Sequence, residues 1–419
     1  MQNKIADLQV RCIISFDGRV EAERMAQAVR LSLDAEPILG CRFVERWWRP
    51  YWKRREDLNH LKNFTLVKTS DSASEIIRFL SESINPLETP LVQVQIVRSE
   101  TDTLCITMNH MVTDAAGLKE YIYLLASIYR KLANNLYYTP QCTMGYERGL
   151  HQISRGFGFI DKLRIVCSGY RDFKRKFFPP ESWSFPATVG TFSHNTFVTR
   201  QFGPNRFRTL KNYGHKHHAT LNEIMLAALF RSLVDHITPA PGLPLRLAFT
   251  VDLRRYLSPG EQSGAIRNLS NFAVMNIRPE IGETFEGTLA KVRDEMITMK
   301  SDFLGLADYP FGSLFAKTLP FAWYQKLFAQ SLRLLIKSKN TPPVLSNAGI
   351  IDSQKLVFSN DVTVNNAHLL AANLFPPALA IGLSSYRGSL TLSISFFESA
   401  IKKSAVERLL DLMDSHLPR

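Results

Sequence analysis

The sequence predicts a protein of the α/β (layered α+β) class with mixed β-sheets in two lobes. Strand-like segments alternate with helix-like segments in both halves of the chain, which is typical of sheet-and-helix layers. The 419 residues are enough for two or three ordinary domains. Hydrophobic residues make up 45% and charged residues 21%, so a disordered, collagen-like or coiled-coil chain is excluded.

The first half begins with a predicted strand and helix. Residues Asp7–Phe16 are partly alternating and rich in Val and Ile, which indicates a strand, and Arg19–Leu33 has apolar side chains at helical spacing. Residues Leu91–Arg98 and Leu104–Met108 are strand-like runs joined by a polar turn, so a hairpin is expected. The apolar spacing over Leu118–Leu132 predicts a helix directly afterwards.

The second half repeats this order. Strands are predicted over Thr196–Phe202 and Leu245–Leu253. Thr220 and Glu223 have the spacing of a capping box, which indicates a helix start. Near the end, the strand-like runs Ala378–Ser384 and Ser389–Phe397 predict a hairpin that turns at Arg387-Gly388.

A basic and aromatic crossover, Arg155–Pro180, separates the halves. It ends in two prolines, so we place the boundary here, with an N-terminal lobe of residues 1–180 and a C-terminal lobe of residues 181–419. The crossover could be a solvated helix with an aromatic core face, a docking site for an acidic acyl carrier, or a contact with anionic lipid. Leu319–Lys339 repeats the same character.

The charge balance points to anionic partners. Lys plus Arg number 51 and Asp plus Glu 38, a net charge of +13. An excess of this kind favours a phosphorylated cofactor, an acidic carrier protein or an acidic membrane surface. Nucleic acid is disfavoured because no recognition motif accompanies the charge, and no glycine-rich loop indicates use of a nucleotide.

Five cysteines without CxxC spacing argue against a disulfide framework and a structural zinc, so a reducing cytosol is expected. The cluster His215, His217 and His218 is better explained as a solvated or helix-capping group than as a metal site. No signal peptide and no membrane span is predicted. We therefore expect a cytoplasmic protein, with peripheral membrane contact as an open alternative and no bound metal.

The sharpest local feature is His110 followed by Asp114, between a predicted strand and helix. A histidine at such a turn can point into a crevice beyond the sheet, and a neutral imidazole can take a proton from a hydroxyl or an amine. Asp114 could lie under the ring or pair with an arginine. The spacing alone is common by chance and does not establish catalysis.

The segment LCITMNHMVTDAAGLKEYIYLLASIY around His110 resembles the core of the condensation and CoA-dependent acyltransferase superfamily. That group includes nonribosomal condensation domains, chloramphenicol acetyltransferase, and alcohol and wax-ester acyltransferases, and its motif is HxxxDG. Other similar segments follow in family order: Ala219–Ala228, Val251–Arg255, Asn268–Ala273 and Ser346–Gly349. The resemblance spans nearly the whole chain.

The resemblance implies two chloramphenicol acetyltransferase-like lobes in a V shape, with a channel between them and His110 at its midpoint. His110 would be the general base or the positioner of the attacking group. Asp114 would be structural and paired with Arg254 or Arg255. The residues that would contact substrate are Asn109, Gly117, Asn271, Ser346 and Asn347.

The implied activity is that of an ester- or amide-forming acyltransferase in natural-product biosynthesis. The acyl group would come from acyl-CoA or from the phosphopantetheine of an acidic acyl or peptidyl carrier protein. It would pass to a hydroxyl or amine of a small molecule or lipid. No permanently bound cofactor is implied, and a monomer is expected.

Two departures from the family motif keep alternatives open. Asn109 stands where the doubled form has a first histidine, and Ala115 stands where the family has glycine. If that glycine permits a positive φ or a close approach, Ala115 would hinder it. One alternative is therefore a non-catalytic condensation-like carrier-binding or scaffold protein. A further alternative is a peripheral membrane O-acyltransferase of the lipid or wax type.

Overall fold

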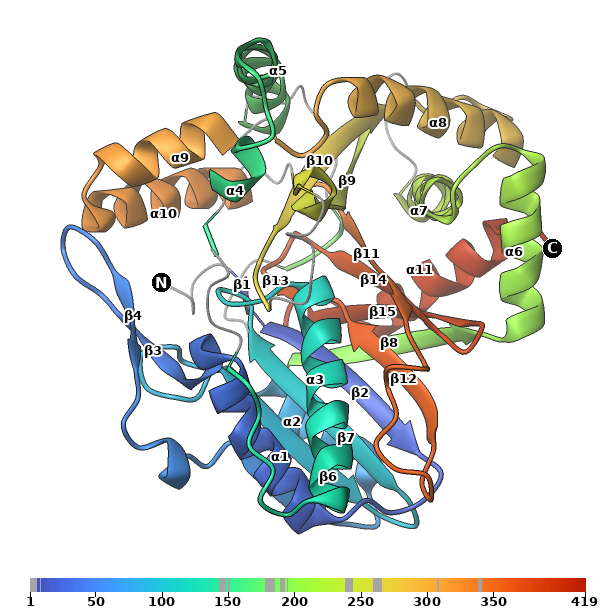
Figure 1. The fold of residues 1–419 in the computed structure, drawn as a ribbon. Helices are drawn as coiled ribbons and strands as arrows, with labels where there is room; N and C mark the ends of the chain where they lie inside the picture. Colours follow the sequence, from blue (N-terminus) through green and yellow to red (C-terminus); the bar gives the residue numbers. More distant parts are fainter. Residues whose placement is uncertain are drawn as a thin grey trace.

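Two mixed sheets with their helices build two lobes in the computed structural model of the chain (Figure 1). The structure describes residues 6–7, 9–142, 148–149, 151–177, 185–188, 193, 195–237, 244–258, 266–306, 309–337 and 341–419. The predicted fold class, mixed sheets arranged in two lobes, is confirmed.

The first lobe contains a five-stranded sheet in the order β12-β2-β7-β6-β5. Its strands are β12 (Val364–Leu370), β2 (Gln9–Phe16), β7 (Asp102–Asn109), β6 (Val92–Arg98) and β5 (Phe64–Lys68). Helices α1 (Ala22–Ala35) and α3 (Ala115–Asn134) bury their apolar faces against one side of the sheet. Helix α2 (Ser72–Ser81) closes a smaller apolar cluster on the other side.

The second lobe contains a six-stranded sheet in the order β10-β9-β11-β14-β15-β8. Its strands are β10 (Ser270–Ile277), β9 (Leu245–Asp252), β11 (Val344–Ile351), β14 (Ala380–Tyr386), β15 (Ser389–Phe397) and β8 (Asn195–Phe202). Its covering helices are α6 (Pro204–Lys216), α7 (Leu221–Ile237), α8 (Phe285–Ser301) and α11 (Lys403–His416). Apolar side chains from these helices and one face of the sheet form the largest core cluster among the described residues.

Most predicted elements lie where the sequence places them. The β6–β7 and β14–β15 hairpins form. The capping box also forms, since Thr220 N donates to Glu223 Oε2 over 2.8 Å and Glu223 N to Thr220 Oγ1 over 3.3 Å. The first helix begins later than predicted, at Ala22, because Val20 N donates to Asp102 Oδ2 and Val20 O accepts from Arg98.

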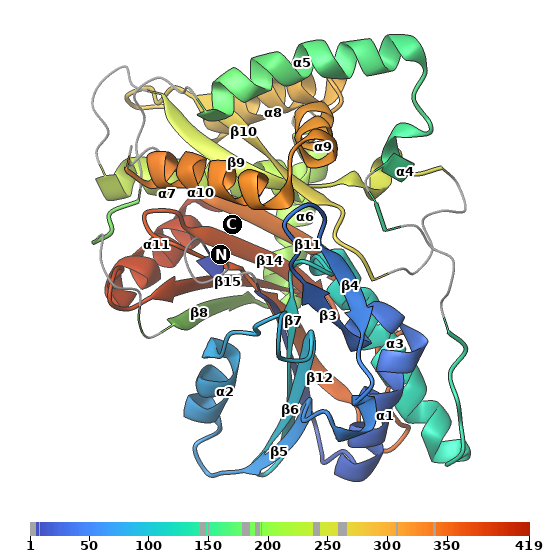
Figure 2. The ribbon, with the colours of Figure 1, turned by 90° about the vertical axis from the view of Figure 1, so that its left-hand side faces the viewer.

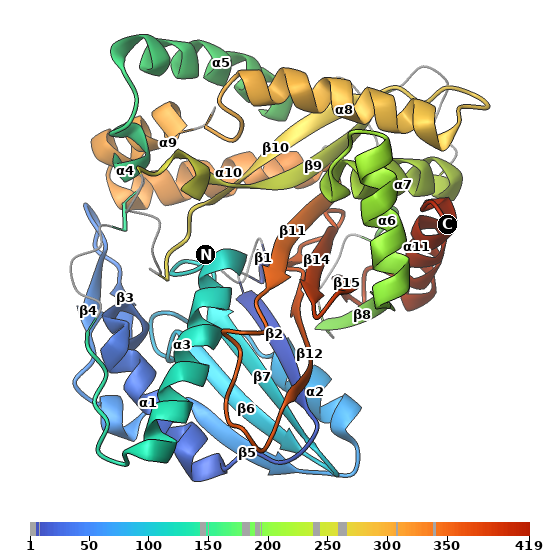
Figure 3. The same ribbon diagram turned by 45° about the vertical axis from the view of Figure 1, so that its right-hand side comes forward.

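Strand β12 connects the lobes. It follows β11 along the chain but pairs with β2, so a strand from the second half completes the first sheet (Figure 3). Serine side chains of the second sheet bind its end and the residue that follows: Ser384 Oγ accepts from Leu369 N, and Ser393 Oγ accepts from Ala371 N over 2.9 Å. The proposed division at residue 180 therefore assigns to the second lobe a strand that lies in the first sheet.

A second connection is the hairpin of β3 (Cys41–Val44) and β4 (Tyr51–Arg54), which reaches the helices α9 (Tyr309–Thr318) and α10 (Phe321–Lys337) (Figure 2). The carbonyl oxygens of its tip accept from the start of α10, Trp48 O from Phe321 N and Trp47 O from Ala322 N. Three tryptophans lie in this hairpin, Trp47 and Trp48 at its tip and Trp52 in β4.

The remaining elements are short or connect the halves. Helix α4 (His151–Ser154) lies just before the crossover and α5 (Phe159–Phe177) lies within it. The others are the strand pair β1 (Ala6–Asp7) and β13 (Asn373–Leu374) and the 3-10 turns η2 (Pro37–Gly40), η3 (Leu58–His60) and η4 (Leu253–Tyr256). No helix in the described ranges combines the length and apolar character needed to cross a bilayer.

Candidate functional site

The candidate site is built on the turn between β7 and α3. Asn109 ends β7, and its side chain is fully buried. Its Oδ1 accepts from Met111 N over 3.0 Å, and its Nδ2 donates to Ile84 O over 3.4 Å. The amide of Asn109 is therefore enclosed and bonded to backbone, and its predicted contact with substrate stays a prediction. Asn109 shapes the turn that presents His110.

Asp114 closes the same turn and is almost completely buried. Its Oδ1 accepts from Gly117 N over 2.8 Å, which caps α3. Two groups of the second lobe reach it: Arg254 forms a bidentate pair with its two oxygens over 2.8 and 3.0 Å, and Leu269 N donates to Oδ2 over 2.8 Å. Both carboxylate oxygens thus accept hydrogen bonds from the helix start and from the second lobe.

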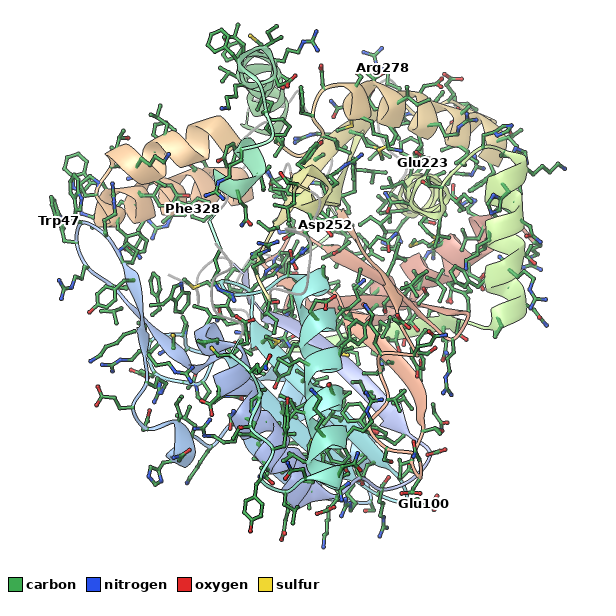
Figure 4. All side chains as sticks on the ribbon, in the orientation of Figure 1. Trp47, Glu100, Glu223, Asp252, Arg278 and Phe328 are labelled. Carbon is green, nitrogen blue, oxygen red and sulfur yellow. The ribbon has the colours of Figure 1, made fainter. Side chains whose placement is uncertain are left out.

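Arg254 is the arginine that pairs with Asp114, which decides between the two arginines left open by the sequence. It lies in η4, directly after β9, and also donates to Asp252 Oδ1 and to Arg267 O. Burial alone would lower the pKa of Arg254, but the hydrogen bonds and charges of Asp114 and Asp252 outweigh burial and raise it. The guanidinium therefore stays charged and holds the two lobes together beside His110. Asp252 lies at the centre of the view in Figure 4.

Gly117 is required by packing. A Cβ at this position would lie 2.3 Å from Thr113 Oγ1 and 3.1 Å from Arg267 O, so only glycine lets the second lobe approach α3 so closely. Gly117 is buried under this backbone, and its predicted contact with substrate stays a prediction. Ala115 is the first residue of α3 and does not adopt a positive φ, so its methyl group causes no backbone strain.

His110 is held by Asn268, which lies just before β10 in the second lobe. Asn268 Nδ2 donates to His110 O over 2.8 Å and lies 3.1 Å from His110 Nδ1. The amide orientation follows from its other contact, since Ser270 N can only donate and it does so to Asn268 Oδ1. The second Nδ2 hydrogen therefore points at Nδ1, which must accept. In the neutral ring the proton then lies on Nε2.

Asn271 was predicted to line the site, but its side chain is used elsewhere. Its Nδ2 donates to Gly305 O over 2.7 Å, and its Oδ1 accepts from Phe272 N over 2.8 Å. Asn271 shares its face of β10 with Ala273 and Met275, which belong to the lobe core. Of the two asparagines in Asn268–Ala273, it is Asn268 that bonds His110, and the predicted role of Asn271 in lining a channel stays a prediction. The strand alternation could have shown that Asn271 faces the core.

Ser346 and Asn347 lie on β11, which α3 also contacts. Ser346 Oγ accepts from Thr250 Oγ1 over 3.4 Å. Asn347 is exposed, and its Oδ1 accepts from Gly349 N in a β-bulge. Lys119 of α3 donates to Ala348 O over 2.6 Å in the same bulge. Lys119 thus joins the bulge beside these two residues to α3. Asp114 and Arg254 bond each other and the backbone of Arg267 and Leu269, and Asn268, which lies between those two residues, bonds His110.

The described residues contain no group of three His, Cys, Asp or Glu side chains that could hold a metal ion. The three histidines of the candidate cluster lie at the end of α6, as expected for a capping group. His217 stacks on Tyr213 with ring centroids 4.1 Å apart, and His218 N donates to His215 O. What the site offers is one partly exposed imidazole in a rigid, hydrogen-bonded frame.

Solved structures with a similar fold cover almost the whole chain, although no protein-family model and no curated protein sequence matches it. The trichothecene 15-O-acetyltransferase of Fusarium sporotrichioides has a TM-score of 0.74 at 13% identity and covers 99% of this chain and 92% of its own. The first condensation domain of the calcium-dependent antibiotic synthetase has a TM-score of 0.71 at 13% identity, with coverage of 99% and 92%. Polyketide synthase associated protein 5 of Mycobacterium tuberculosis has a TM-score of 0.67 at 14% identity, with coverage of 100% and 95%. The chain thus shares its two-lobed fold with these solved structures.

Proposed function

We propose that the protein is an acyltransferase that moves an acyl group from a thioester to a hydroxyl or an amine. The donor is acyl-CoA or an acyl group on the phosphopantetheine of an acidic carrier protein, and the acceptor is a small molecule or a lipid. The observation that carries the proposal is the placement of His110. Its ring is partly exposed at the junction of the lobes, and no described residue bonds its Nε2.

The contact with Asn268 favours one of the two roles that the sequence left open. A general base at Nε2 needs that nitrogen free of its proton, but Asn268 Nδ2 favours the form in which Nδ1 accepts and Nε2 carries the proton. His110 then donates from Nε2 to an oxygen of the reacting groups. The role supported best is that of a hydrogen-bond donor and positioner.

The reaction proceeds without help from a bound cofactor, because the thioester already activates the carbonyl. A lone pair of the acceptor attacks the carbonyl carbon, the carbon–sulfur bond breaks, and the released sulfur takes up the proton that the acceptor loses. His110 donates a hydrogen bond from Nε2 to the carbonyl oxygen while that oxygen carries negative charge, and it keeps its proton. A fixed donor of this kind is typically worth about a hundredfold or more in rate.

The scaffold alternative is the weaker proposal, because both departures that motivate it have structural explanations. Ala115 takes up a regular position at the start of α3. Asn109 is buried and its side chain anchors the turn through hydrogen bonds to backbone, so the turn forms without a histidine at this position. With both residues in place, the imidazole of His110 is present and is bonded by Asn268 of the second lobe.

The test is direct. The purified protein is incubated with a panel of acyl-CoA and acyl-carrier donors and candidate acceptors, and products are followed by mass spectrometry and by thiol release. We expect His110→Ala to lower turnover at least about a hundredfold with an unchanged melting temperature. His215→Ala, an exposed histidine on α6, is the matched control and keeps full turnover. Carrier binding without any acyl transfer would instead support the scaffold role.

A further inference from the structure

Helix α5 exposes a stripe of apolar side chains to solvent, whereas an ordinary surface helix buries its apolar face. Phe159, Leu163, Val166 and Tyr170 follow helical spacing, so they share one face, and they are between 46% and 80% exposed. The inner face instead contributes Ile165, which joins the core of the second lobe. The fold therefore leaves about half or more of each of these side chains exposed.

Helix α10 repeats the pattern nearby. Trp323, Leu327 and Leu334 are spaced four and seven residues apart and are 58%, 50% and 69% exposed. The tip of the β3–β4 hairpin adds Trp47 and Trp48, also at least half exposed. Figure 2 shows α9, α10, the hairpin tip and α5 on the side turned to the viewer, and Trp47 lies beside α10 in Figure 4. We call these two stripes and the hairpin tip the docking surface.

The charges around the docking surface are largely positive. Neither α9 nor α10 contains an Asp or a Glu. The exposed basic side chains on these elements are Arg46, Lys53, Lys162, Arg164, Lys317, Lys326 and Arg333. Among the described side chains nearby, two acidic ones, Glu45 and Asp161, accept from Gln325 and from Gly158 N and are outnumbered by these basic residues. The surface is therefore complementary to an anionic partner with an apolar interior.

The shape of the surface favours a membrane over a protein. A helical peptide partner needs an apolar groove, whereas these side chains stand on the outward faces of two helices and on a hairpin tip. Separate convex stripes can enter a lipid headgroup region together. Tryptophan prefers that region, and each basic residue near an anionic leaflet adds about 1 kcal/mol of attraction.

We infer that the docking surface binds the face of an anionic lipid bilayer, with the stripes of α5 and α10 and the hairpin tip entering the headgroup layer. This inference goes beyond the proposed reaction and does not depend on it. The protein would then meet a lipid acceptor or a membrane-dissolved acyl product at the bilayer. A carrier protein on the same surface is the competing occupant.

The experiment is co-sedimentation of the full chain with vesicles of phosphatidylcholine, with or without about 30% phosphatidylserine, at about 0.05 and 0.5 M salt. We expect at least about tenfold stronger binding to the anionic vesicles at low salt, and loss of that preference at high salt. Three of the five tryptophans lie at positions 47, 48 and 323, so brominated lipids should quench the fluorescence. Absence of binding at low salt would overturn the inference.

Paired variants localise the contact. Trp323→Ser with Leu327→Ser should weaken binding at least about tenfold, whereas Ile297→Ser, an equally exposed apolar residue on α8, should not change it. Lys326→Glu with Arg333→Glu should abolish the anionic preference.

Arg208→Glu with Lys216→Glu makes the same charge change on α6 and should have little effect. Equal losses in both pairs, or lost binding to an acidic carrier with vesicle binding intact, would contradict a bilayer at this surface. His110→Ala should bind vesicles like the unaltered protein, which keeps this result separate from the reaction.

Discussion

The junction around His110 and the docking surface differ in which side chains they bury. The junction buries charged groups, and the docking surface exposes apolar ones. At the junction, a carboxylate and a guanidinium are buried, and every oxygen of Asp114 has a partner. On the docking surface, tryptophans and leucines are exposed and leave much of their apolar area uncovered. Buried charge is costly unless its hydrogen-bond network is complete, and a large exposed apolar patch is typical of a surface that a partner covers. The fold itself therefore supplies the partners of the charged groups at the junction, whereas the apolar side chains of the docking surface need a partner to cover them.

The largest expected effect comes from breaking the finished network. Asp114→Ala leaves Arg254 buried without its main partner, so we expect a loss of about 3–5 kcal/mol in the free energy of unfolding. Urea unfolding followed by circular dichroism measures it. Asp252→Ala removes the exposed partner of the same arginine and should cost less than about 1 kcal/mol. A stable but inactive Asp114→Ala protein would show that Asp114 takes part in the chemistry.

The second prediction concerns a buried group in the strand that joins the lobes. Burial lowers the pKa of His368 to about 4, and no described residue bonds its Nδ1. An unfolded histidine binds its proton near pH 6.5, so stability is complete above that pH and falls as pH drops toward 4, by about 3 kcal/mol in all. Unfolding measured at pH 7 and pH 4.5 tests this. His368→Gln should flatten the His368 part of the profile, and an unchanged slope would exclude this histidine as the cause.

Asn268→Asp sharpens the role of the junction. The carboxylate would accept a hydrogen from Nδ1, so the proton leaves Nε2 and the donor is lost. We expect kcat to fall about 10–100-fold with little change in KM. Nitrogen NMR of the imidazole reports which ring nitrogen carries the proton. A higher kcat in this variant would show that His110 acts as a base. Asn212→Asp, on an exposed residue of α6, is the charge-matched control.

The smallest expected effect tests how closely the lobes meet. Gly117→Ala places a methyl group against Thr113 Oγ1 and the backbone of Arg267, so we expect a loss of about 1–2 kcal/mol in the free energy of unfolding. Gly156→Ala is the control because nothing lies within 4 Å of the added carbon. Equal melting temperatures for both variants would show that the contact relaxes without cost.

The sequence was sufficient where local pattern decides the structure and insufficient where distant segments meet. Alternation and spacing predicted both hairpins, the capping box and the helix after His110. The pairing of Asp114 with Arg254 came from the resemblance, since these residues are 140 positions apart. Asn268 was missed because its partner is 158 positions away and the neighbouring Asn271 fits the same motif. Strand β12 was missed because its partner strand lies at the other end of the chain.

The position of β12 limits how this molecule can be divided. A fragment that ends at residue 180 would lack β12 and leave the backbone of β2 as an open sheet edge with apolar neighbours. Such an edge recruits other strands, so the fragment should aggregate unless the complementary fragment is produced with it. An N-terminal fragment cut at residue 180 will therefore need the segment that carries β12 to stay in solution.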